Sequence, residues 1–175
     1  MNTKKLIITD PCYLLDGEEW AECCDVWGDD ENETPAAFLK KIEEKLNQKG
    51  GNIKQVVGVA KSPDGDGAFF VEPLNGTKCR EFEFWVDSGV WCVCVVNNFD
   101  VRPMNDGIAK IEIENSGALC ITRYKNMPQN RYYINSGSQN MAVIDFDAEL
   151  DDDDDWKKDL PDDDDDCDLG APPEF

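Results

Sequence analysis

Apolar residues spaced three and four positions apart predict two helices in the first third of the chain. The first helix begins at a capping box formed by Asp16 and Glu19, and it ends at Gly28. Its apolar face comprises Trp20, Cys23, Cys24 and Trp27. The second helix has Thr34 as its N-cap and Pro35 as its first residue, and two glycines end it. Its apolar face comprises Phe38, Leu39, Ile42 and Leu46.

The chain from residue 53 to residue 146 has the alternating pattern and the turn residues that are typical of strands. Together with an initial strand at 6–9, the expected strands are 53–60, 67–72, 80–86, 90–97, 108–114, 118–124, 131–134 and 141–146. Within 80–86, the alternation places Phe82, Phe84 and Val86 on one buried face. The run 90–96 is apolar throughout, as in a central strand that is covered on both faces.

Turn sequences predict hairpins between these strands. The turns are 64–67, 75–76 and three triplets of the form Asp/Asn-Ser-Gly at 87–89, 115–117 and 135–137. The sequence therefore predicts an α+β fold, in which a curved antiparallel sheet or a partly closed barrel carries two N-terminal helices. We expect residues 1–146 to form this single globular domain and residues 147–175 to form a disordered acidic tail.

Acidic residues are concentrated at the C-terminus. The 175 residues include 38 acidic and 17 basic side chains, which gives a net charge of −21. Residues 145–175 account for −14 of this charge and residues 1–144 for −7. This balance argues against a nucleic-acid backbone or an anionic membrane surface as the partner. The apolar run at 6–8 is too short for a secretion signal or a membrane span, so we expect a cytoplasmic protein.

The chain contains no histidine, which excludes a Ser-His-Asp triad, a Cys-His dyad and any zinc site that needs imidazole. Its eight cysteines include no Cys-x-x-Cys pair and are expected to be free thiols, although thiolates gathered in space could still hold zinc. Cys92 and Cys94 share one strand face and are predicted to be buried. Asp10 and Cys12 form the candidate catalytic pair, but the favoured interpretation is structural, with Asp10 capping a turn.

The Asp-Gly-Asp-Gly sequence at 64–67 resembles the start of a calcium loop. Asp64 and Asp66 are therefore candidate metal ligands. The residues that follow are Ala68, Phe69 and Phe70, which cannot supply the further side-chain oxygens that an EF-hand needs. A tight turn is the favoured interpretation, and we expect no cofactor and no resident metal.

The C-terminal tail holds the candidate binding residues. Dense carboxylates along a flexible chain imitate the charge density of a nucleic-acid backbone and favour a basic groove as the partner. The one aromatic side chain within the acidic tract is a candidate docking anchor. A tail that only solubilises the protein is the alternative. The candidate residues are Asp151, Asp152, Asp153, Asp154, Asp155, Trp156, Asp162, Asp163, Asp164, Asp165, Asp166 and Phe175.

Three short motifs resemble those of a group of small uncharacterised bacterial and phage proteins. They are Asp-Pro-Cys-Tyr at 10–13, Gly-Asp-Gly at 65–67 and Val-Asp-Ser-Gly at 86–89, within a resemblance that covers 6–97. The resemblance implies a phage or mobile-element origin and no particular activity. The acidic tail, which closes with Pro-Pro-Glu-Phe at 172–175, resembles the tails of single-stranded DNA-binding proteins. That second resemblance implies a small β-barrel body and a tail that recruits replication proteins.

These observations lead to one favoured hypothesis and two alternatives. The favoured hypothesis is a non-enzymatic acidic interaction protein that engages a basic, normally nucleic-acid-binding, surface of another protein. Its concrete form is a nucleic-acid mimic that inhibits a host nuclease or defence complex. The first alternative is a single-stranded DNA-binding protein with a regulatory tail, although the sequence of the body lacks a cluster of lysine and arginine. The second is a thiol-dependent enzyme that uses Cys12.

Overall fold

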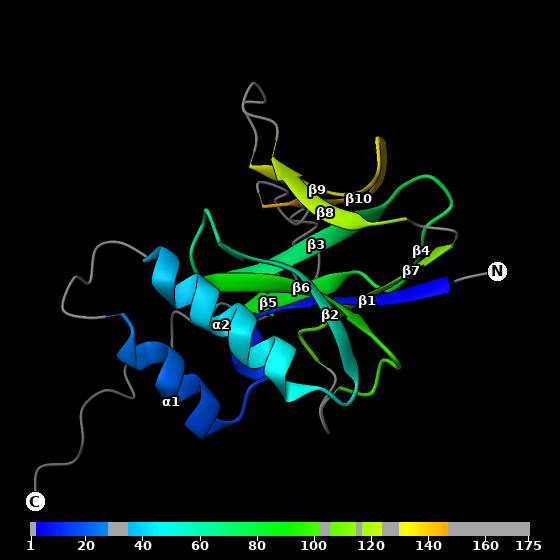
Figure 1. Ribbon diagram of the computed structural model, residues 1–175. Coiled ribbons are helices and arrows are strands. Elements are labelled where there is room, and N and C mark those ends of the chain that lie inside the picture. The colour runs from blue at the N-terminus through cyan, green and yellow to red at the C-terminus, as the bar shows by residue number, and fades with distance from the viewer. Residues whose placement is uncertain (1–2, 28–34, 102–105, 115–116, 124–129, 147–175) are drawn as a thin grey trace, which may run out of the picture.

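The structure is a computed structural model that describes residues 3–27, 35–101, 106–114, 117–123 and 130–146. Within these residues, two α-helices and two antiparallel sheets are stacked in three layers (Figure 1). The helices lie against one face of the first sheet, and the second sheet packs against its other face. The predicted α+β class is confirmed, and the tail 147–175 lies outside the described residues.

The helical elements follow the first strand. A short 3-10 helix spans Pro11–Tyr13, α1 spans Gly17–Asp25 and α2 spans Ala36–Lys49. The predicted Asp16 and Glu19 capping box is present, since each side chain accepts a hydrogen bond from the other residue's backbone N–H. Two details differ from the prediction. Helix α2 begins at Ala36 with Pro35 as its N-cap, and Cys24, which was placed on the apolar face of the first helix, is exposed. The predicted helix ends at Gly28 and Thr34 lie outside the described residues.

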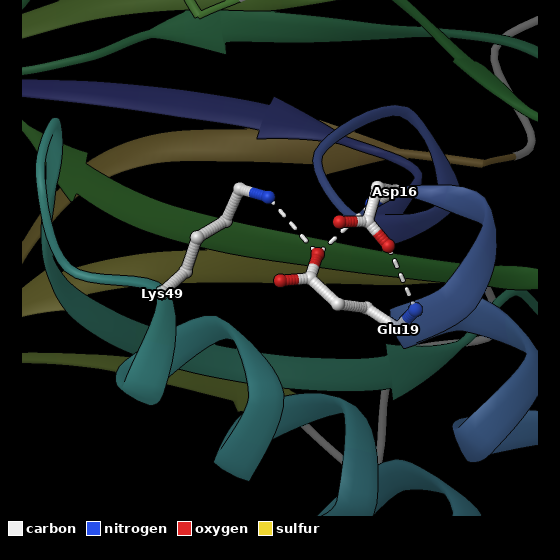
Figure 2. Close-up of polar contacts among 3 residues, drawn as sticks. All are labelled: Asp16, Glu19 and Lys49. Carbon is white, nitrogen blue, oxygen red and sulfur yellow. Dashed lines mark hydrogen bonds and ion pairs between the residues drawn. The ribbon is translucent and has the colours of Figure 1, made fainter.

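Glu19 also joins the two helices, because Lys49 at the end of α2 donates a hydrogen bond to its carboxylate at 2.9 Å (Figure 2). The hydrogen bond from the Asp16 N–H and then the contact with Lys49 lower the pKa of Glu19. A carboxylate with a lowered folded-state pKa stabilises the fold above its unfolded pKa, which is about 4.3 for glutamate. That stabilisation is lost as the pH falls through the lower folded-state value.

Replacing Asp16 by alanine is therefore expected to lower the free energy of unfolding by about 1 kcal/mol at neutral pH, because the first turn of α1 loses its cap. Replacing Glu19 by glutamine should also remove part of the acid sensitivity of the wild type. Urea unfolding at neutral pH and at about pH 3 measures both effects. A Glu19→Gln protein that loses as much stability on acidification as the wild type would contradict the role given to this carboxylate.

Each sheet has five strands. The first sheet has the order β2 (Ile53–Lys61), β6 (Val90–Val96), β1 (Thr3–Thr9), β7 (Ala109–Glu114) and β4 (Lys78–Glu81). The second has the order β5 (Glu83–Val86), β3 (Gly67–Pro73), β10 (Gln139–Asp145), β9 (Arg131–Ser136) and β8 (Leu119–Arg123). Neighbouring strands are antiparallel throughout, and the first strand of the chain, β1, lies between β6 and β7.

Strand β6 carries two hydrophobic cores. Its residues Trp91, Val93 and Val95 face the second sheet and belong to the core between the sheets. The alternate residues Val90, Cys92, Cys94 and Val96 face the helices, where they pack with Phe38, Ile42 and Leu46 of α2. All seven residues of β6 are buried, which confirms the prediction of a central strand and of buried Cys92 and Cys94. The seven described cysteines are free thiols.

The prediction of one curved sheet or a partly closed barrel was wrong, because the strands form two separate sheets that do not close. The turns explain the difference. The turns at 64–67, 75–76 and 87–89 each connect a strand of one sheet to a strand of the other, so they are not hairpins. Of the predicted hairpins, the one at 135–137 is present and joins β9 to β10. Residues 115–116 of the remaining predicted turn lie outside the described residues. A turn sequence specifies a reversal of the chain, whereas the choice of sheet depends on distant partners.

The predicted strand 80–86 is also divided between the sheets. It breaks at Phe82, with β4 ending at Glu81 in the first sheet and β5 beginning at Glu83 in the second. Phe84 and Val86 are fully buried as predicted, but the Phe82 side chain is 51% exposed. The prediction of one buried face from the alternation of apolar residues was therefore correct only on one side of the break.

No helix among the described residues has the length and apolar character to cross a membrane.

Candidate functional site

The end of β1 is connected to a distant turn by a buried carboxylate. β1 ends at Thr9 and Pro11 begins the 3-10 helix, so the Asp10 side chain lies at a helix N-cap with no exposed surface. Its Oδ1 accepts a hydrogen bond from the Cys12 N–H at 2.8 Å. Its Oδ2 accepts the N–H of Asp87 at 2.8 Å and that of Ser88 at 2.6 Å, and the Ser88 hydroxyl donates at 2.8 Å. Asp10 therefore holds the turn 87–89 against the N-terminal strand.

Residues from the three motifs singled out in the sequence lie close together around this cluster. Asp10 joins the motif at 10–13 to the motif at 86–89. Gly67, which ends the third motif, pairs with Val86 in the second sheet. The chain just before that motif is attached as well, because the Ser62 N–H donates to the Gly89 carbonyl at 2.8 Å. Each of the three motifs therefore contributes at least one residue to this junction of the fold.

Tyr13 adds a second contact to the same junction. Its hydroxyl donates a hydrogen bond to Asp87 Oδ2. Partial burial and then the contact with Asp87 raise the pKa of Tyr13 well above its ordinary value of about 10. The phenol therefore stays neutral and acts as a hydrogen-bond donor across the physiological pH range.

The candidate catalytic pair occupies this junction. Both carboxylate oxygens of Asp10 accept hydrogen bonds from backbone N–H groups, and the half-buried Cys12 contributes one of those N–H groups. A carboxylate used in this way positions the chain, as the structural interpretation of Asp10 expected. The thiol-enzyme hypothesis remains an untested prediction.

The candidate metal ligands Asp64 and Asp66 are exposed residues of the connection between β2 and β3. In the part of the chain that the structure describes, no group of three or more Asp, Glu, Cys or His side chains is placed to hold a metal ion. The aspartates of the tail, together with Trp156 and Phe175, lie outside the described residues. Their role as binding residues stays a prediction.

A hollow of about 210 Å³ lies where the chain passes from β4 to β5. Three carboxylate side chains and one indole ring contribute to its lining, with a single lysine beside them. We call it the acidic hollow, and it is lined by Glu81, Glu83, Trp85, Asp106, Gly107, Ile108 and Lys110. Phe82, which separates β4 from β5, is a second exposed aromatic side chain at this crossing. The sequence pattern alone does not predict this hollow. The feature that could have indicated it is the alternation of Glu81 and Glu83 with aromatic residues.

Trp85 is held firmly although its side chain is 38% exposed. Its Nε1 donates to Glu83 Oε1 at 2.8 Å, and its backbone N–H donates to the Gly107 carbonyl at 3.0 Å. Gly107 lies directly behind the ring, since a Cβ at this position would be 2.7 Å from Trp85 Cε3. Gly107 also has a φ of +77°, which residues with a side chain rarely adopt. Both the backbone conformation and the contact with the ring therefore require glycine at this position. Thr9 fixes Gly107 in turn by donating its hydroxyl to the same carbonyl at 2.9 Å.

This arrangement suits a cationic side chain. A guanidinium or ammonium group is attracted both by carboxylates and by the face of an indole ring, and the indole–cation contribution is about 0.5–2 kcal/mol. The acidic hollow offers three carboxylates against one lysine, with an aromatic ring already held in place. Arginine and lysine side chains are therefore the ligands that its chemistry favours.

The comparisons found no matching family model, no matching curated protein and no matching solved structure. The resemblances to small phage proteins and to the tails of single-stranded DNA-binding proteins therefore remain predictions from the sequence motifs.

Proposed function

We propose that this protein is a non-enzymatic interaction protein that binds a basic, normally nucleic-acid-binding, surface of another protein. In its concrete form it is a nucleic-acid mimic that inhibits a host nuclease or defence complex, encoded by a phage or mobile element. The observation that carries the proposal is the acidic hollow beside the fixed and exposed Trp85. The acidic tail supports it through the charge of −14 in residues 145–175.

The two acidic features supply different parts of such an interaction. A dense run of carboxylates attracts a basic surface over a distance of about 8 Å at physiological salt and speeds association. A preformed hollow with an aromatic wall then selects individual cationic side chains, which the tail alone does not. Clusters of arginine and lysine line the grooves of proteins that bind nucleic acid, so such a groove presents the side chains that both features favour.

The test uses a fluorescein-labelled peptide of arginine residues as the probe and measures its binding by fluorescence anisotropy. The site variant is Glu81→Gln, Glu83→Gln and Asp106→Asn in one full-length chain. A matched control removes three negative charges from exposed helix positions, through Glu18→Gln, Glu43→Gln and Glu44→Gln. We expect the site variant to weaken binding about tenfold, a loss of about 1.4 kcal/mol, and the control to weaken it no more than about twofold.

Equal weakening by the two triple variants would contradict the role of the acidic hollow, because general charge would then explain the binding. A fluorescein-labelled single-stranded DNA is tested in parallel on the unaltered protein. DNA binding as tight as peptide binding would overturn the proposal in favour of the DNA-binding alternative. A Trp85→Leu variant removes the indole ring and should weaken the arginine peptide severalfold while leaving the net charge unchanged.

A further inference from the structure

A second hollow, of about 220 Å³, lies where β1 and β2 begin and β6 ends. It is opposite in character to the acidic hollow, since its lining includes three lysines and no acidic side chain. We call it the lysine hollow, and it is lined by Thr3, Lys4, Lys5, Lys54, Gln55, Val95 and Val96. The fold brings Lys54 of β2 to the same end of the first sheet as Lys4 and Lys5 of β1, with β6 between the two strands. Lys4 and Lys5 alternate along β1, so Lys4 lies on the face toward the second sheet and Lys5 on the face toward the helices.

The three lysines lack acidic partners within the part of the chain that is described. Lys45 and Lys49 form salt bridges to carboxylates of α1, whereas no described carboxylate lies within 4 Å of the ammonium group of Lys4, Lys5 or Lys54. The Lys4 ammonium donates to the Gly117 carbonyl at 2.8 Å, and that of Lys5 lies 5.8 Å from the centre of the Phe99 ring.

One carboxylate does lie opposite Lys5, and it is already engaged. Glu112 pairs with Lys5 in the register of β1 and β7, but its Oε1 contacts Arg80 at 3.2 Å. The lysine hollow therefore keeps an excess of positive charge on a chain whose net charge is −21. Positive charges that lack acidic partners at a surface favour an anionic ligand.

We propose that the lysine hollow binds the aspartate runs of this chain's own C-terminal tail. Residues 147–175 lie beyond the last described residue, and residues 151–155 and 162–166 are consecutive aspartates. No other segment of this length in the chain has a comparable density of negative charge. The contact is a feature of the free protein and does not rest on the proposed function.

The tail is long enough to reach the hollow. The last described residue, Phe146, contacts the Trp91 ring of β6, with ring centroids 5.4 Å apart. Val95 lies four residues further along β6, a distance of about 13 Å at the rise of a strand. The five residues from Phe146 to Asp151 span up to about 17 Å when extended, which is close to the whole distance once the gap between the two rings is added. The sixteen residues from Phe146 to Asp162 span up to about 53 Å, so the second aspartate run reaches the hollow with length to spare.

The strength of this contact comes from the tether rather than from any single ion pair. An exposed lysine–carboxylate pair contributes about 0–1 kcal/mol, but a short tether holds the aspartates near the hollow at an effective concentration of about millimolar. Salt shortens the range of the attraction from about 10 Å at 0.1 M to about 3 Å at 1 M. The contact should therefore form at low ionic strength and be released as salt is added.

Carbodiimide cross-linking of the full-length protein tests the proposal, because this reagent joins lysine to carboxylate only when the two groups are in contact. The monomer is isolated after the reaction, and cross-linked peptides are quantified by mass spectrometry. We expect residues 151–166 to be joined to Lys4, Lys5 and Lys54 at least about fivefold more often than to the control lysines Lys40, Lys41 and Lys61. This preference should disappear in about 0.5 M sodium chloride.

A full-length variant in which aspartates 151–155 and 162–166 are replaced by asparagine supplies a second measurement. Its backbone amide spectrum should differ from that of the wild type at Val95, Val96 and Lys54 and should be unchanged at Lys40 and Lys41. Cross-links spread evenly over all six lysines, or an unchanged amide spectrum at the hollow, would overturn the proposal. Inorganic phosphate added at millimolar concentration should compete for the hollow and reduce the tail cross-links, and no reduction would also count against it.

Discussion

Replacing Asp10 by alanine is expected to lower the free energy of unfolding by about 4 kcal/mol, because the substitution removes a buried carboxylate and leaves three partly buried hydrogen-bond donors without an acceptor. The donors are the backbone N–H groups of Cys12, Asp87 and Ser88, all within 2.8 Å of the carboxylate. Asp10 has no exposed surface, so water cannot simply replace it. Urea unfolding followed by tryptophan fluorescence measures the loss.

Asp64 provides the matched control for this prediction. It is an exposed aspartate in a connecting loop, and its replacement by alanine should change the free energy of unfolding by less than about 0.5 kcal/mol. The loss of stability in Asp10→Asn should lie between these two values. The amide oxygen can still accept a hydrogen bond, but the amide NH₂ faces backbone donors. An Asp10→Ala protein as stable as the Asp64→Ala protein would show that the junction between β1 and the turn 87–89 does not depend on the carboxylate.

Replacing Trp91 by alanine is expected to cost about 4 kcal/mol for a different reason, the loss of a large side chain from the core between the sheets. Trp91 is fully buried, and its ring lies 5.0 Å from that of Tyr132 and 5.4 Å from that of Phe146. The two partners come from the second sheet and the end of β10. The cavity would therefore open between the two sheets. Neither sheet can move to fill it without disturbing the pairing of its strands.

Two further tryptophan variants separate volume from chemistry. Trp91→Phe keeps a six-membered ring but removes the rest of the indole, including an N–H that has no partner among the described residues, so it should leave a smaller cavity and cost about 2 kcal/mol. Trp85→Ala removes the same side chain from an exposed position and should cost about 1 kcal/mol. Thermal or urea unfolding of the three proteins should show the largest loss of stability in Trp91→Ala and smaller losses in Trp85→Ala and Trp91→Phe. Equal losses at Trp91 and Trp85 would contradict the assignment of the core.

Features that depend on neighbouring residues were predictable from the sequence. The capping box of Asp16 and Glu19, the apolar face of α2 and the fully buried β6 are each specified by the spacing of nearby side chains. The arrangement of the strands was not predictable in this way. The sequence at 87–89 ensures that the chain turns, but it does not tell whether the next strand joins the same sheet, because that strand is paired by β1 and β2.

The two hollows could not be predicted from the sequence for the same reason. The acidic hollow combines β4 and β5 with Asp106 and Gly107, and the lysine hollow combines β1 with the start of β2. Neither set of residues is contiguous, so no spacing rule could have found it. The motif at 10–13 predicts that Asp10 caps a turn, but it does not predict that the same carboxylate binds the backbone of Asp87 and Ser88. The exposed Phe82 likewise depends on a break between sheets that alternation does not reveal.

The position of β1 has a consequence for how the chain acquires its fold during synthesis. β1 is made before its two neighbours in the sheet, which lie about 90 to 110 residues downstream, at Val96 for Lys5 and at Glu114 for Thr3. The strands β8, β9 and β10, by contrast, follow one another and pair with their nearest neighbours in the chain. The N-terminal strand therefore leaves the ribosome with an unpaired apolar face and unpaired edges, and it must wait for most of the domain before it is covered.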